Sequence, residues 1–149
     1  MTKQYSVART IDARPDVVWA LLTDAAGYGN WNPAVVSIQG PIEAGTTIEL
    51  VSIASPKRTF KLKVAVMEPP HLMVSSDAMA LGLFKGERTY RLRDRDGGTE
   101  FSMTEECSAG SWCERVVTCF TALTNDRHRA VSAVHAHRFN IGSERFADP

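Results

Sequence analysis

Two oppositely charged residues, Arg88 and Glu105, are the strongest candidates for chemistry in this chain. They lie in two alternating segments separated by Asp96 and Gly97, a pair typical of a tight hairpin turn. A hairpin centred on that turn places Arg88 directly opposite Glu105, on the apolar side of both strands. Opposite charges across a strand pair satisfy each other, whereas either charge alone is costly on a buried face. The pattern therefore predicts a paired arginine and glutamate on an inward face.

Tyr90 has the same inward parity as Arg88, so it adds a hydroxyl to the same interior. Such groups could orient a carboxylate, phenol or enolate or act as acids and bases, and the catalytic candidates are therefore Arg88, Tyr90 and Glu105. Two simpler interpretations stay open. The charged pair can be a structural ion pair, because structural networks use the same residue types. A buried tyrosine commonly bonds to a backbone group.

The histidines and serines lack the spacing that metal binding or nucleophilic catalysis needs. His128 and His135 lie two helical turns apart, about 10 Å, so they cannot share one metal ion. The sequence contains no zinc-type spacing, nucleophile elbow or phosphate loop. Its serines have no predicted base beside them. We therefore expect no metal site, no cofactor and no covalent catalysis.

Composition narrows the class of partner. The 149 residues carry 17 Lys and Arg against 17 Asp and Glu, so no basic surface favours nucleic acid. No apolar run approaches the roughly 20 residues of a membrane span, and we see no signal peptide. The odd number of cysteines (Cys107, Cys113 and Cys119) indicates free thiols in a reducing cytoplasm. A small hydrophobic molecule is the expected partner, while a monomer and a homodimer both stay open.

Alternation and turn residues predict one domain, residues 1–149, that begins with a strand and two short helices. Six further strands follow, with short turns between them, so they should form an antiparallel meander. In residues 58–67, for example, one face is expected to carry Phe60, Leu62, Val64 and Val66. Residues 111–139 lack Pro and Gly, and apolar residues recur there every three or four positions, which predicts a long helix. The predicted fold is α+β: a curved seven-stranded antiparallel sheet wrapped around this helix, with a cavity between them.

Strand parity predicts where that cavity opens. The turns 54–57, 78–83 and 108–111 share one end of the sheet, and the apolar loop 78–83 is either a partial lid or packs on the helix. Arg58 is expected at the rim. For Arg127, either the helix outruns the sheet at this position, which we favour, or the side chain reaches into the cavity. The expected ligand-binding residues are Phe60, Leu62, Phe84, Arg88, Tyr90, Met103, Glu105, Trp112, Val116 and Phe120.

Two stretches carry a family resemblance. Residues 13–24 and 28–33 read ARPDVVWALLTD and YGNWNP. They resemble the P-x-x-V-W-x-L-L-x-D and W-N-P run of the START-like superfamily, also called SRPBCC, in its bacterial polyketide cyclase/dehydrase and lipid-transport-like branch. The stretch from Gly97 to Phe101 and Glu105 are also similar to that branch, so the resemblance covers essentially the whole chain. It implies the helix-grip fold and a cavity, but no particular chemistry. The chain lacks the Cys-x-His pair of Rieske-linked members, which argues against that role.

Three functions fit these observations. The first is binding of a small hydrophobic or aromatic ligand, lipid-like or polyketide-like, in the internal cavity. The second is a polyketide cyclase or dehydratase that uses the polar residues of the cavity, although a fold alone does not establish an enzyme. The third is a partner-binding module with an exposed apolar patch in place of a deep pocket.

Overall fold

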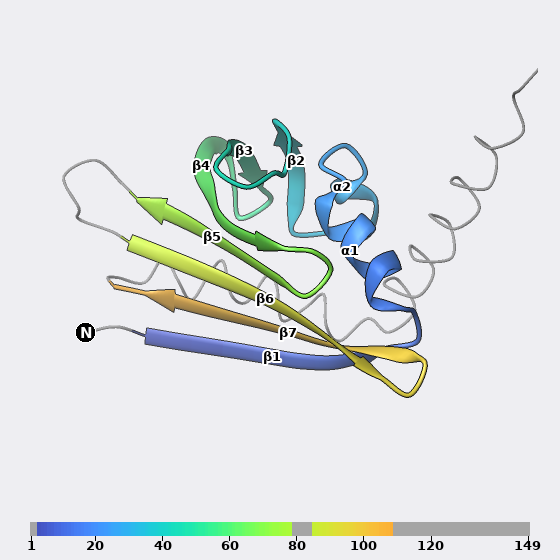
Figure 1. Cartoon of the computed structure of the whole chain (residues 1–149). Coiled ribbons are helices and arrows are strands. Elements are labelled where there is room, and N and C mark those ends of the chain that lie inside the picture. Colours follow the sequence, from blue (N-terminus) through green and yellow to red (C-terminus); the bar gives the residue numbers. More distant parts are fainter. Residues whose placement is uncertain (1–2, 79–84, 109–149) are drawn as a thin grey trace, which may run out of the picture.

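The computed structural model describes residues 3–78 and 85–108 of the chain, and its cartoon is Figure 1. Two short helices and seven strands follow one another in these residues. In chain order they are β1 (Lys3–Ile11), α1 (Pro15–Thr23), α2 (Tyr28–Trp31), β2 (Val35–Gln39), β3 (Thr47–Ser52), β4 (Ser55–Glu68), β5 (Leu72–Ala78), β6 (Lys85–Arg95) and β7 (Gly98–Cys107).

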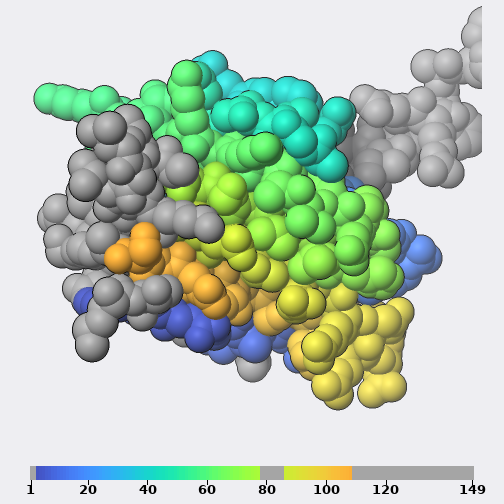
Figure 2. All heavy atoms as spheres, turned by 60° about the vertical axis from the view of Figure 1, so that its left-hand side comes forward, coloured from blue at the N-terminus to red at the C-terminus, as the bar shows by residue number. Residues whose placement is uncertain are grey.

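The strands form one antiparallel sheet with the order β1-β7-β6-β5-β4-β3-β2. The six later strands are a meander, and β1 pairs beside the last of them. The sheet is curled, with α1 and α2 at the end where β1 stops and the β6–β7 hairpin turns (Figure 1). In the space-filling view, that hairpin projects in yellow from the end of the sheet (Figure 2). The predicted seven-stranded antiparallel sheet with two short helices after its first strand is confirmed.

Helix α1 forms because its sequence supplies both a start signal and an apolar stripe. Pro15 occupies the first turn, where its missing N–H has no helical partner to lose, and Asp16 lies at the positive end of the helix dipole. The buried positions Val18, Leu21 and Leu22 follow helical spacing and pack against the concave face of the sheet. The sheet and the two helices thus enclose a common core.

The predicted β6–β7 register is confirmed. Arg88 lies opposite Glu105, and Tyr90 lies opposite Met103. Both turn residues adopt positive φ, 46° at Asp96 and 87° at Gly97, as the tightest hairpin turn requires. This turn fixes which side chains of the two strands face inward.

The expectation for the second half of β4 is wrong at Val66. The pairing of β4 with β5 shifts between Val64 and Val66, and such an irregularity adds a residue to one strand. Val66 is therefore 39% exposed, while Met67 packs against the core. Val64, before the shift, is almost fully buried, as expected.

The expectation of three free thiols is also wrong. Cys107 is 2% exposed and disulfide-bonded. An odd number of cysteines permits one bond and one remaining thiol, and the spacing gave no signal for it. The inference from free thiols to a reducing cytoplasm therefore loses its basis. Among the described helices, none has the length and apolar character needed to cross a membrane.

Several predictions fall outside the described residues. These are the long helix at 111–139, the lid residues 79–83, Arg127, and four of the expected ligand-binding residues, Phe84, Trp112, Val116 and Phe120. They stay predictions.

Replacing Thr99 with valine is expected to lower the free energy of unfolding by about 1–3 kcal/mol. Thr99 is fully buried at the start of β7, and its hydroxyl donates a 2.6 Å hydrogen bond to the backbone oxygen of Ala13. Valine keeps the shape but leaves that buried oxygen without the bond. Urea unfolding measures the loss, and Thr89→Val is the matched control on β6. Equal stability of both variants would contradict this role for the hydroxyl.

Candidate functional site

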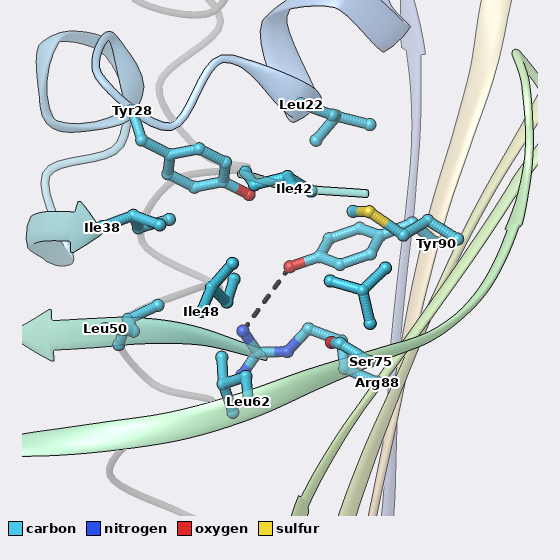
Figure 3. A pocket seen from close by; sticks show the side chains of 12 residues that line it. Leu22, Tyr28, Ile38, Ile42, Ile48, Leu50, Leu62, Ser75, Arg88 and Tyr90 are labelled. Carbon is cyan, nitrogen blue, oxygen red and sulfur yellow. Dashed lines mark hydrogen bonds between the residues drawn. The ribbon is translucent and has the colours of Figure 1, made fainter. Parts of the chain in front are cut away.

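A small hollow lies on the concave face of the sheet, beneath the two helices (Figure 3). It measures about 30 Å³, enough for about two water molecules. Helices and five consecutive strands contribute to its wall, and its lining residues are Leu22, Tyr28, Ile38, Ile42, Ile48, Leu50, Leu62, Val64, Met73, Ser75, Arg88 and Tyr90.

A polar row crosses the concave face beside this hollow. Ser75 pairs with Arg88 across β5 and β6, and Arg88 pairs with Glu105 across β6 and β7. Tyr5 of β1 lies opposite Glu105 at the end of the row. Directly opposed residues share a face of the sheet, so these four polar side chains form one row across the strands on the same face.

Arg88 and Glu105 form the buried ion pair predicted from the hairpin. The guanidinium Nε donates to Glu105 Oε2 at 2.6 Å, and Nη2 lies 2.5 Å from the same oxygen. Both side chains are nearly buried, with 11% and 10% of their surface exposed. Charge-assisted bonds of this kind are the strong ones, and low exposure reduces their screening by water.

Two tyrosine hydroxyls belong to the same wall, and that of Tyr90 contacts the guanidinium. Arg88 Nη1 donates to the Tyr90 hydroxyl at 3.5 Å, the dashed line in Figure 3, and the Tyr28 hydroxyl points into the hollow from α2. Burial raises the pKa of Tyr28 well above its usual value, and its interaction with Tyr90 acts in the same direction. The Tyr28 phenol therefore keeps its proton at neutral pH and remains a hydrogen-bond donor.

The charges in this part of the sheet influence one another. Burial tends to lower the pKa of the Arg88 guanidinium, but Tyr90 and Glu105 outweigh it and the net pKa is raised. Burial raises the pKa of Asp77, which also interacts with Arg58, Glu105 and Arg88. Arg88 therefore stays positively charged across the physiological range.

Three of the expected ligand-binding residues line the hollow: Leu62, Arg88 and Tyr90. Phe60 of β4 and Met103 and Glu105 of β7 are not part of its wall. Arg58 is half-buried at the start of β4, with its guanidinium carbon 5.0 Å from the centre of the Phe60 ring. In the described part of the chain, no three metal-ligating side chains come together.

Two polar residues of the hollow were missed in the sequence. Ser75 looked isolated, yet it faces the same interior as Arg88, the residue paired with it. The inward parity of Met73 and Ser75 was the signal that could have found it. Tyr28 belongs to the stretch that resembles the family motif, but only the packing of α2 places it in the wall that Arg88 and Tyr90 also line. The Trp31 ring lies 4.5 Å from the Tyr28 ring and so helps to position it.

Three solved structures resemble this chain over most of the length of both proteins. The aromatase/cyclase Zhui from Streptomyces sp. R1128 superimposes with a TM-score of 0.64 at 16% identity, covering 95% of this chain and 96% of that one. A START superfamily protein from Mycobacterium smegmatis gives 0.67 at 13% identity, covering 89% and 97%. Ara h 8.0201 gives 0.66 at 13% identity, covering 91% and 99%. At these identities the likeness shows the fold alone.

A family model relates the chain to its relatives more directly. The model described as polyketide cyclase / dehydrase and lipid transport matches residues 2–136. No curated protein matches the chain. Because the match covers most of the chain, the protein belongs to the polyketide cyclase/dehydrase and lipid-transport family.

Proposed function

We propose that this protein binds a small hydrophobic or aromatic molecule in the cavity on the concave face of its sheet. The observation that carries the proposal is the division of the wall into two parts. Eight of the twelve lining residues have aliphatic or thioether side chains, and the other four (Tyr28, Ser75, Arg88 and Tyr90) supply polar atoms. Sites for small molecules are mostly apolar with a few placed polar groups, which is the pattern here.

The two parts of the wall have different tasks in this proposal. The aliphatic side chains exclude water and hold the carbon skeleton of the ligand. The Tyr28 and Tyr90 hydroxyls and the Arg88 guanidinium orient an oxygen of the ligand. A bicyclic aromatic is larger than the present hollow, so binding widens it; Met73, with three rotatable bonds, is the side chain best able to move. Phe60, Met103 and Glu105 are further candidate contacts on the same face.

The fluorescent probe 2-naphthol tests this proposal. The purified protein should bind it saturably, at one site per chain. Ser75→Leu fills the hollow and should weaken binding by roughly tenfold or more, since a close-packed interior does not readily accept the extra volume. Ser76→Leu is the matched control, because successive strand residues face opposite sides of the sheet. Native mass spectrometry of the same protein would show any ligand carried through purification.

Two results would remove the proposal. One is the absence of saturable binding of 2-naphthol, together with no carried ligand. The other is equal binding by Ser75→Leu and Ser76→Leu, which would place the probe elsewhere on the surface.

The presence of Arg88 and two tyrosine hydroxyls in one wall favours a second candidate, a cyclase or dehydratase acting on a polyketide-like substrate. A guanidinium and phenol donors aimed at one point can stabilise the negative oxygen of an enolate, the species through which such ring closures pass. A linear poly-β-keto thioester incubated with the protein should then yield a cyclised product that has lost water, detected by mass spectrometry. Unchanged substrate, from a protein that binds 2-naphthol, would leave ligand binding as the function.

A further inference from the structure

We propose that Glu105 sets the charge preference of the cavity: by neutralising Arg88, it makes the site select neutral, oxygen-bearing ligands over carboxylates. This inference rests on the proposed ligand-binding function and specifies the chemical class of the ligand. An arginine in an apolar cavity usually suggests an anionic partner such as a fatty acid. Here the structure assigns the role of that anion to Glu105, a residue of the protein itself.

The geometry of the pair supports this assignment. Arg88 reaches Glu105 Oε2 through both Nε and Nη2, so Glu105 already occupies one of the two edges at which a guanidinium binds a carboxylate bidentately. On the other edge, Nη1 donates to the Tyr90 hydroxyl. The pair lies directly across two central strands and is nearly buried. A ligand carboxylate would therefore have to compete with a fixed, desolvated carboxylate for the same donors.

The acidic side chain of Asp77 acts in the same sense. Asp77, on the neighbouring strand β5, interacts electrostatically with Glu105 as well as with Arg88 and Arg58. A carboxylate ligand at Arg88 would thus approach two acidic side chains, and like charges brought together in a poorly solvated site repel strongly. Nearby acids are a repulsive element against the wrong ligand, in addition to any attraction for the right one.

A neutral ligand oxygen fits the same wall without displacing the pair. A phenol or enol can accept a hydrogen bond from the Tyr28 or Tyr90 hydroxyl. Where the widened cavity extends beyond the present wall to β7, it can also donate to Glu105, whose two bonds to Arg88 both end on Oε2. A ligand carboxylate has no hydrogen to donate to that group. The cavity therefore distinguishes the two ligand classes by protonation as well as by charge.

Two probes of one shape, 2-naphthol and 2-naphthoate, test the inference at neutral pH. The wild-type protein should bind 2-naphthol at least roughly tenfold more tightly than 2-naphthoate. Glu105→Gln removes the internal anion, and a charge-assisted bond from Arg88 should then raise affinity for 2-naphthoate about tenfold to hundredfold. The order of preference should therefore reverse. Glu106→Gln is the control, because Glu106 is exposed on the next position of β7, and it should behave as the wild type.

The outcomes separate this inference from the proposed function. If the wild type prefers 2-naphthoate, or if Glu105→Gln binds both probes in the wild-type ratio, the inference is wrong while ligand binding stands. If neither probe binds to the wild type or the variants, both are wrong. Circular dichroism checks that Glu105→Gln is folded. If Glu105→Gln does not fold, the inference is tested by the ratio of the two affinities in the wild type and in Glu105→Asp. The aspartate keeps the charge, so this variant should keep the preference for 2-naphthol.

Discussion

Replacing Arg88 with leucine is expected to lower the free energy of unfolding by about 3–5 kcal/mol, the usual cost of breaking a buried ion pair. The loss arises less from the missing bonds than from Glu105, which is 8% exposed and would keep a buried charge without its partner. Removing both charges avoids that penalty. The double variant Arg88→Leu/Glu105→Leu should therefore be much more stable than the single one, and close to the wild type.

Urea unfolding of the four proteins in this cycle measures the coupling between the two residues. Arg91→Leu is the matched control, because Arg91 is exposed on the opposite face of β6, and its effect should stay within about 0.5 kcal/mol. A double variant whose loss of stability equals the sum of the losses of Arg88→Leu and Glu105→Leu would contradict the account, since additivity would mean that each residue stabilises the fold independently of the other. The double variant should still prefer 2-naphthol to 2-naphthoate, because a buried carboxylate ligand would then have no cationic partner.

Replacing Met73 with alanine is expected to have opposite effects on stability and on binding. Met73 is 4% exposed and lines the hollow. Its truncation should lower the free energy of unfolding by about 2–5 kcal/mol, because it removes buried contacts and enlarges a cavity. The same space becomes available to a ligand, and apolar cavities of this kind accept aromatic molecules. Affinity for 2-naphthol should therefore rise.

Met67→Ala is the control for this variant. Met67 packs against the core but is not part of the wall of the hollow. It should lose stability without gaining affinity, which isothermal titration and urea unfolding of both variants would show. If Met73→Ala binds 2-naphthol no more tightly than Met67→Ala does, the hollow is not where the probe binds.

The hairpin that carries the site could be predicted from the sequence because local chemistry fixes it. Asp96 and Gly97 tolerate the positive φ that a two-residue turn needs, and a turn of known length sets the register. Two-residue alternation then decides which side chains face inward. The inward positions of Arg88, Tyr90 and Glu105 therefore follow from the amino-acid sequence alone.

The rest of the wall depends on information that is not local. The shift in pairing near Val64 reverses the parity of the end of β4, and nothing in the sequence of that strand marks it. Tyr28 reaches the hollow only because α2 packs beside β2, far from Arg88 along the chain. The disulfide bond of Cys107 likewise depends on a partner that spacing alone did not indicate. Local patterns thus predicted the strands, but not how distant segments close the cavity.

Methyl-labelled NMR tests the central claim, ligand binding on the concave face, most directly. On titration with 2-naphthol, the account predicts chemical-shift changes at the methyl groups of Ile38, Ile42 and Ile48, which line the hollow. The exposed methyl groups of Val36, Ile53 and Val66 should not move. Shifts confined to the exposed set, or no shifts at either set, would contradict the claim.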